Sequence, residues 1–418
     1  MTLHEARRFD ETDPLRKWRD EFWIPTRENG EQEVYFVGNS LGLQPRRTAG
    51  YVQAELEKWQ RLGVRGHFES ELPWMPYHEF LAEPMADLVG AQADEVVMMN
   101  GLTVNLHLML ATFYRPTKSR HKILIEEHAF PSDYQVAQSQ IQHHGFDPAE
   151  SLITAKASAG QATLDNDALC DLIRQHGDSL AVVLLPGVQY YTGQVIDMAR
   201  IAEAAHSVGA IIGLDLAHAA GNIPLSLHDW EIDFAAWCSY KYLNSGPGSV
   251  AGCFVHRKHA TDVELPRLAG WWGHDKQTRF EMKNHFQPIP TAEGWQLSNP
   301  PILSMAAVRA SLSVFKEAGG IAPLREKSLK LTAYFEELLS ETLGDRVNII
   351  TPSNPSERGC QLSFELVGVE GRKIQDELEL RGMMTDWREP NVIRAAPVPL
   401  YNSFEDVFRF VEALKKLM

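Results

Sequence analysis

Ala210-Ile-Ile-Gly-Leu-Asp-Leu-Ala-His218 is an apolar run that ends in a carboxylate, with an imidazole three residues later. Its aliphatic side chains predict a buried strand, and Asp215 falls at the carboxyl end of that strand. In parallel α/β sheets, ligands bind beyond this end of the strands. A single aspartate in this position is usually only a loop cap, so the interpretation depends on the next strand along the chain.

That next strand is predicted by Ile232-Asp-Phe-Ala-Ala-Trp-Cys-Ser-Tyr-Lys241, which carries Tyr240 and Lys241 to its end. A lone lysine there usually extends its amine into solvent. Asp215 and Lys241 at successive strand ends, however, match the needs of pyridoxal phosphate, because an amine binds its aldehyde and a carboxylate keeps its ring nitrogen protonated. The small-residue loop Asn244-Ser-Gly-Pro-Gly-Ser249 also lets the backbone approach a cofactor. We therefore predict a pyridoxal-phosphate enzyme.

Two motifs upstream fit the same cofactor. Asn100-Gly-Leu-Thr-Val-Asn105 follows a predicted strand and opens a helix, so the Thr103 hydroxyl and the nearby N–H groups can hold a phosphate. Phe130-Pro-Ser-Asp133 follows the next strand and offers an aromatic face that can stack on a pyridine ring. Taken alone, the first motif indicates an ordinary helix cap and the second a core phenylalanine. Their agreement with Asp215 and Lys241 favours the cofactor site.

The wider pattern predicts an α/β protein. Short apolar runs alternate with amphipathic stretches, which indicates a large domain with a mostly parallel, helix-covered sheet. The predicted strands are 95–100, 122–126, 151–155, 180–185, 210–215, 234–239 and 252–255, with helices over 166–175 and 197–208. From residue 304 the sequence predicts long helices that are interrupted at Gly319 and Gly320. A small α+β domain is predicted to follow, with strands at 347–350 and 361–366, a helix over 372–381 and a strand that ends near Arg394. The capping pattern Ser403-Phe-Glu-Asp406 predicts the start of a last helix. We expect an N-terminal segment, 1–45, that packs on the small domain, a large cofactor-binding domain, 46–303, and a small domain, 304–418.

Composition excludes several other classes of protein. The chain has 418 residues, with 40 Lys and Arg against 55 Asp and Glu, and its net charge of −15 without a basic block argues against binding to nucleic acid or to an anionic membrane. No apolar run approaches the roughly 18 residues that span a membrane. The charged N-terminus lacks a signal-peptide pattern, and the four cysteines are scattered singly in apolar surroundings. We expect a cytoplasmic protein with buried thiols and no metal site.

Several motifs together resemble kynureninase, a fold-type-I pyridoxal-phosphate enzyme family of tryptophan catabolism with an aspartate-aminotransferase-like fold. The resemblance extends from Val37-Gly-Asn-Ser-Leu-Gly-Leu-Gln44 to Asn402, nearly the whole chain. It is carried by Phe130-Pro-Ser-Asp133, Asp215-Leu-Ala-His218, Cys238-Ser-Tyr-Lys-Tyr-Leu-Asn244, Gly270-Trp-Trp-Gly-His274, Leu297-Ser-Asn-Pro-Pro301 and Arg394-Ala-Ala-Pro-Val-Pro-Leu-Tyr-Asn-Ser403.

This resemblance implies roles for individual residues. Catalysis would fall to Lys241, which binds the cofactor, to Asp215, which pairs with its ring nitrogen, and to Tyr240. His218 would lie against the cofactor and Phe130 would stack on it. The cofactor shell would be completed by Leu102, Thr103, Pro131, Ser132, Asp133, Trp271 and Asn299, the last two supplied by the partner subunit of a homodimer. The substrate would be bound by Arg394, His67, Ser298, Asn299, Asn39 and Ser40.

The implied reaction is hydrolytic Cβ–Cγ cleavage of L-kynurenine or its 3-hydroxy derivative, which yields L-alanine and anthranilate or 3-hydroxyanthranilate. Such a reaction belongs to tryptophan catabolism or NAD biosynthesis. The first alternative is a cysteine desulfurase or selenocysteine lyase, which needs a reactive cysteine. Cys360 is the only thiol in the C-terminal half, at the start of a predicted strand, where a buried structural role is favoured. The second alternative is a non-catalytic protein on the same fold, which would be expected to have lost Lys241 or Asp215.

Overall fold

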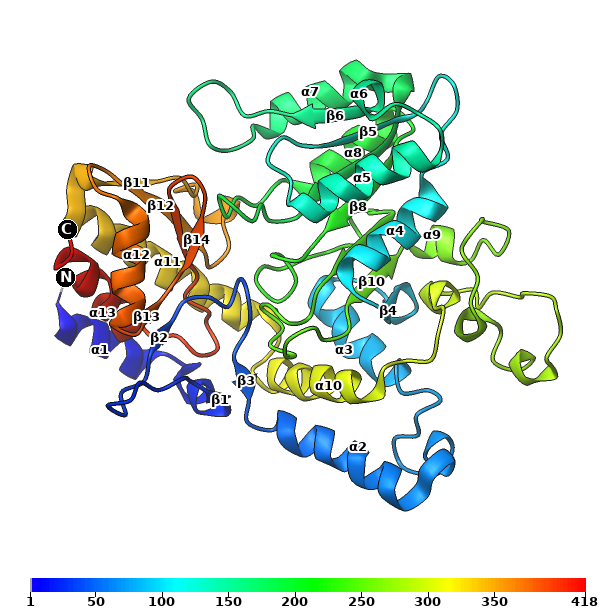
Figure 1. The fold of residues 1–418 in the computed structure, drawn as a ribbon, viewed down its shortest axis with the longest axis horizontal. Helices are drawn as coiled ribbons and strands as arrows, with labels where there is room; N and C mark the ends of the chain where they lie inside the picture. Colours follow the sequence, from blue (N-terminus) through cyan, green and yellow to red (C-terminus); the bar gives the residue numbers. More distant parts are fainter. Residues whose placement is uncertain (1) are drawn as a thin grey trace.

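The computed structural model describes residues 2–418, and its centre is a seven-stranded sheet (Figure 1). All neighbouring strands run parallel except those beside β10, which is antiparallel to both of its neighbours. The prediction of a mostly parallel sheet is therefore confirmed. In spatial order the strands are β4 (Val96–Met98), β10 (Gly252–Val255), β9 (Phe234–Trp237), β8 (Ile211–Asp215), β7 (Leu180–Pro186), β5 (Lys122–Glu126) and β6 (Leu152–Ala155).

Helices cover both faces of this sheet because its strands are apolar on both sides. Ile123 and Ile125 of β5 pack into one hydrophobic cluster, whereas Leu124 between them packs into the other. The first cluster includes α4 (Leu102–Phe113) and α5 (Pro131–His143). The second includes α3 (Glu79–Val89), α7 (Asn166–His176), α8 (Met198–Ser207) and α10 (Ile302–Glu317). Most residues of these strands are buried under the helices, so a site can form only at the strand ends and in the loops beyond them.

A second, smaller unit follows α10 (Figure 1, left). Gly319 and Gly320 both have positive φ and separate α10 from α11 (Ile321–Leu343). The predicted interruption of the helices at these glycines is confirmed. A four-stranded antiparallel sheet packs on the helices in the order β11 (Val347–Ile349), β12 (Leu362–Leu366), β15 (Val392–Ala395) and β14 (Asp386–Arg388), with α12 (Gly371–Leu380) and α13 (Phe404–Lys415). Ser403 and Asp406 form the predicted capping box at the start of α13.

The N-terminal segment lies against this smaller unit. Helix α1 (Leu3–Thr12) packs on α13, and β2 (Val34–Tyr35) pairs in parallel with β13 (Met383–Met384). A buried ion pair of 2.7 Å joins Lys327 to Asp13. The other short elements are β1 (Phe22–Trp23), which pairs with β3 (Gln44–Pro45), and the helices α2 (Thr48–Leu62), α6 (Pro148–Ser151) and α9 (Arg257–Ala260).

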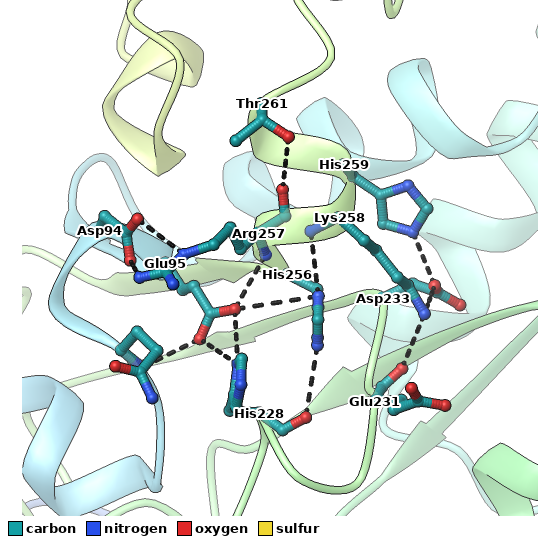
Figure 2. A network of polar contacts seen from close by, with 11 residues as sticks. Asp94, Glu95, His228, Glu231, Asp233, His256, Arg257, Lys258, His259 and Thr261 are labelled. Carbon is teal, nitrogen blue, oxygen red and sulfur yellow. Dashed lines mark hydrogen bonds and ion pairs between the residues drawn. The ribbon is translucent and has the colours of Figure 1, made fainter.

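Two buried carboxylates tie the strands together at the opposite end of the sheet from Asp215 (Figure 2). Asp233 precedes β9, accepts a hydrogen bond from the Ile212 N–H and pairs with His206, His259 and Lys258. Burial alone would raise the pKa of the Asp233 carboxyl, but the hydrogen bonds from the two histidines hold it well below its usual range. Glu95 likewise accepts from the Arg257 N–H and contacts His228. These contacts link the amino-terminal ends of β4, β8 and β9 to the carboxyl end of the antiparallel strand β10.

Two further findings bear on the class of protein. All four cysteines are unpaired and buried. Among residues 2–418, every helix is too short or too polar to cross a membrane.

Candidate active site

A cavity of about 500 Å³ opens at the carboxyl ends of β5, β7, β8 and β9, between the sheet and residues of the smaller unit. This is the position at which α/β sheets bind ligands. The cavity brings together most of the side chains singled out in the sequence, although they are spread over more than 350 positions of the chain. Those that line it are Asn39, Ser40, Leu102, Thr103, Phe130, Ser132, Asp133, Asp215, His218, Tyr240, Lys241 and Arg394.

Lys241 lies in the loop after β9, because this strand ends at Trp237 rather than at Ser239 as predicted. Its Nζ is 3.0 Å from Nε2 of His218 and 5.8 Å from the centroid of the Phe130 ring. The loop is held closely from outside: the Gly42 N–H donates to the Tyr240 carbonyl, and a Cβ at Gly42 would lie only 2.3 Å from the Lys241 carbonyl oxygen. The N-terminal segment therefore fixes the backbone that presents the lysine.

Three buried carboxyl groups meet on the wall near this amine. Burial raises the pKa of Asp215, although the Ala217 N–H and the charge of Lys241 oppose the shift. Burial, reinforced by the charge of Asp215, raises the pKa of Asp133 well above its usual range. Burial and the same charge raise the pKa of Glu126 to about 8. The cluster therefore favours protonated carboxyl groups or a cationic partner in the cavity.

His218 is buried and kept neutral. Burial, followed by the positive charges of Lys241 and Arg394, lowers its pKa well below the usual range. Its Nδ1 atom is buried without a hydrogen-bond partner among the described residues. A neutral imidazole with its Nε2 toward the lysine accepts a hydrogen bond from the ammonium and presents a flat face to the cavity.

The amino terminus of α4 supplies a place for an anion. Gly101 is the N-cap and no side chain caps this helix, so the first N–H groups of its 12 residues are available to a ligand. Thr103 adds a hydroxyl, and Gly248 and Ser249 face it from the small-residue loop after Lys241. The predicted phosphate-binding position is thus within the same cavity.

Arg394 enters from the smaller unit and is 1% exposed. Its Nη1 donates to the Tyr190 carbonyl at 2.7 Å, and its Nη2 pairs with Asp386. The Nε atom has no partner among residues 2–418. A buried guanidinium with an unused N–H is suited to a carboxylate ligand.

Five predicted residues do not line the cavity within one chain. Pro131 begins α5 beside residues that do. His67 lies beyond α2, with Nδ1 3.0 Å from the Val64 carbonyl oxygen and its ring edge against Trp74. Trp271, Ser298 and Asn299 belong to the excursion between α9 and α10, which projects from the chain (Figure 1, yellow-green). A role for His67, Trp271, Ser298 and Asn299 stays a prediction that depends on a second subunit.

The cavity also contains residues that the sequence analysis missed. Glu126 ends an apolar strand just as Asp215 does. Searching for carboxylates at the carboxyl ends of apolar strands would therefore have found Glu126 as well. Tyr190 and Arg388 come from a loop and from a short strand, and no local pattern marks them. Tyr190 comes from the loop after β7 of the large sheet, whereas Arg388 reaches the cavity because the smaller unit docks on that sheet.

Pyridoxal phosphate fits these residues. A flat cationic ring would find the aromatic side chains of Phe130 and His218 in the cavity wall, and its protonated nitrogen would balance the buried carboxylate of Asp215. The uncapped terminus of α4 suits a phosphate, and Lys241 Nζ is free of any carboxylate partner among the described residues. The donor set of the cavity thus matches each part of the cofactor.

Comparison with known proteins points to the family that the sequence motifs resemble. Residues 324–414 match the family described as the kynureninase C-terminal domain. A kynureninase of Koribacter versatilis (strain Ellin345) is 54% identical over 411 residues, covering 98% of this chain and 96% of the relative. Kynureninases of Flavobacterium psychrophilum and Xanthomonas axonopodis pv. citri are each 52% identical, with 99% of this chain and 98% of their own length covered.

Solved structures share the fold at low sequence identity. A C-DES variant with glycine covalently linked to its PLP cofactor has a TM-score of 0.78 at 17% identity, covering 95% of this chain and 98% of its own. The cysteine desulfurase CsdA of Escherichia coli has a TM-score of 0.76 at 19% identity, covering 96% and 98%. These structures confirm the predicted fold type, which kynureninases and cysteine desulfurases share. The 52–54% identity to kynureninases over nearly the whole chain decides between these two families. The chain belongs to the kynureninase family.

Proposed function

We propose that this chain is a pyridoxal-phosphate-dependent kynureninase, which hydrolyses the Cβ–Cγ bond of L-kynurenine or 3-hydroxy-L-kynurenine. The products are L-alanine and anthranilate or 3-hydroxyanthranilate. The observation that carries the proposal is the convergence of Lys241, Asp215 and Arg394 on one cavity in a chain of this family. The cofactor, when bound, supplies an electron sink that lets a carbanion form next to the amino group of the substrate.

The residues of the chain hold the cofactor and move protons. Lys241 would hold the cofactor through its aldehyde, and its amine, once released, could take up the α-proton of the substrate. Asp215 holds the proton on the ring nitrogen, and Phe130 and His218 orient the ring. Leu102, Thr103, Pro131, Ser132 and Asp133 complete the shell of the cofactor.

Tyr240 and Arg394 act on the substrate side. Burial raises the pKa of the Tyr240 phenol, so the phenol keeps its proton at neutral pH and can donate a hydrogen bond to the substrate. Arg394 receives the α-carboxylate on its guanidinium, whose Nε–H has no other partner among residues 2–418. Asn39 and Ser40 of the N-terminal segment also line the cavity and add hydrogen-bonding groups.

We further propose a cytoplasmic homodimer in which each subunit completes the other's site. The excursion between α9 and α10 exposes five large apolar side chains, which a partner would cover: Val263, Leu268, Trp271, Phe280 and Met282. Trp271 and Asn299 would reach the partner's cofactor, and His67 and Ser298 would line the substrate pocket there. Four free buried thiols suit a reducing compartment, and the reaction would serve tryptophan catabolism or NAD biosynthesis.

A desulfurase is the weaker candidate because it needs a reactive thiol. Cys360 is fully buried, and burial raises the pKa of its thiol to about 12. The discriminating experiment supplies kynurenine, 3-hydroxykynurenine and cysteine separately to the purified holoenzyme and follows alanine release. We expect alanine and the aryl acid from at least one kynurenine and full activity in Cys360→Ala. Alanine from cysteine alone, with the sulfur transferred to the Cys360 thiol as a persulfide and both products lost in that variant, would establish the desulfurase instead.

A further inference from the structure

Three charged side chains share one face of the small sheet. Asp386 and Arg394 are direct partners in the antiparallel register of β14 and β15, and Arg388 follows two residues after Asp386. One carboxylate oxygen of Asp386 accepts from Nη2 of Arg394, and the other accepts from Nη1 of Arg388 at 2.7 Å. A single carboxylate therefore bridges two guanidinium groups.

The two arginines differ in how far they are enclosed. Arg394 is buried, whereas the side chain of Arg388 is 33% exposed. Both line the cavity, and Asp386 lies behind them rather than in its wall. Arg388 is held in place from its Nη1 atom, which also donates to the Trp387 carbonyl at 2.7 Å. It is thus an ordered cation at the more open side of the cavity.

The charges of this cluster do not cancel. Two guanidinium groups and one carboxylate leave one net positive charge, and this charge is directed at the cavity. Burial is the main reason for the low pKa of His218, but the charge of Arg388 contributes with those of Lys241 and Arg394, so its field reaches the centre of the site. One net positive charge is complementary to one carboxylate, as an amino-acid substrate provides.

We propose that Arg388 is a second substrate-recognition residue, and that Asp386 limits the cluster to the single positive charge that one α-carboxylate neutralises. This inference rests on the proposed function, in which Arg394 binds that carboxylate. Arg388 would select for the carboxylate without taking part in bond cleavage, so its loss should act on binding rather than on the chemical step.

The test measures binding of the product L-alanine and of L-alaninamide, which lacks the carboxylate, to the holoenzyme through the absorption spectrum of the cofactor. Arg388→Gln should weaken L-alanine binding roughly 10-fold or more, the size expected for a charge-assisted hydrogen bond, and leave L-alaninamide unchanged. Arg388→Lys keeps the charge and should stay within about threefold of wild type. With kynurenine as substrate, Arg388→Gln should raise KM and leave kcat within about threefold.

A second substitution tests the charge balance. Adding Asp386→Asn to Arg388→Gln restores one net positive charge, so the double variant should bind L-alanine about threefold or more tightly than Arg388→Gln alone. Glu365→Gln is the matched control, because this carboxylate lies in the same sheet but bonds to Asn348 outside the cavity. It should bind both ligands as the wild type does.

Three results would overturn the inference: wild-type L-alanine binding in Arg388→Gln, an equal loss for L-alaninamide, or no recovery in the double variant. The binding measurement does not require kynurenine cleavage, so it separates the two proposals. A wild-type enzyme that binds L-alanine through Arg388 but cleaves neither kynurenine would contradict only the proposed function. A wild-type enzyme that cleaves kynurenine and is indifferent to Arg388→Gln would contradict only this inference.

Discussion

Nζ of Lys241 lies 3.0 Å from Nε2 of His218, and the imidazole is buried and neutral. A neutral ring accepts a hydrogen bond from the ammonium without adding a second positive charge to the cavity. This hydrogen bond therefore orients the lysine amine within the cavity. This arrangement reduces the conformational entropy that Lys241 loses when it reacts.

Lys241→Ala should lose both the absorption band of lysine-bound cofactor and at least about 100-fold in kcat, because the proton carrier is removed. The measurement combines the spectrum of the holoenzyme with initial rates on kynurenine. Lys373→Ala, on the exposed surface of α12, is the control and should keep both properties. Wild-type spectrum and rate in Lys241→Ala would refute the assignment.

Asp215→Asn should fold normally but lose roughly 100-fold or more in kcat, because an amide cannot hold a proton on the ring nitrogen and the electron sink weakens. Circular dichroism and kinetics on kynurenine check the two parts of this expectation. Asp171→Asn removes a carboxylate that is exposed on α7 and should leave the rate unchanged. Turnover within a few-fold of wild type in Asp215→Asn would contradict the role of this carboxylate.

Glu126 should make the stability of the cofactor-free protein depend on pH. Burial raises its pKa from the ordinary value of 4.5 to about 8, so between these values the folded state binds a proton that the unfolded state releases. The free energy of unfolding should therefore decrease as pH rises through this window, by an amount on the order of a few kcal/mol.

Glu126→Gln stays neutral at every pH, so its unfolding free energy should decrease less than that of the wild type across this window, where Asp133 and Asp215 still contribute. Urea denaturation at several pH values measures the difference. The neighbouring Glu127 pairs with Lys156 on the surface, so Glu127→Gln should retain the wild-type dependence. If Glu126→Gln and wild type show parallel pH profiles, Glu126 is not protonated in the folded state.

The aryl substrate should be selected by polar groups that lie outside the cavity of a single chain. We expect His67 and Asn299, with Ser298, to favour 3-hydroxykynurenine, because its hydroxyl pairs with polar groups that plain kynurenine would leave unsatisfied. One such hydrogen bond corresponds to roughly 5-fold to 150-fold in kcat/KM. The preference is measured by kcat/KM for both substrates in the wild type and in a His67→Ala, Asn299→Ala double variant. A preference for plain kynurenine, or a preference that survives the double substitution, would exclude this role.

The prediction of the fold succeeded where local sequence decides structure. The apolar runs ending at Glu126 and Asp215 became buried strands within one residue of their expected bounds, because a strand covered on both faces must be apolar throughout. The capping box at Ser403 is equally local. Strand β9 ended two residues early, since Ser239 and Tyr240 leave the sheet to form the turn that presents Lys241.

The sequence by itself determined the strands of the large sheet, the helices and strands that follow residue 304, and the positions of Asp215 and Lys241 at or just beyond two strand ends. The spacing of apolar residues, the turn residues and the ends of strands are all encoded within short stretches. Only the tertiary structure decided that Arg388 and Tyr190 join the cavity and that Asp386 bridges two arginines. Contacts between residues far apart in the chain depend on how the small unit docks on the sheet, and no local pattern carries that information.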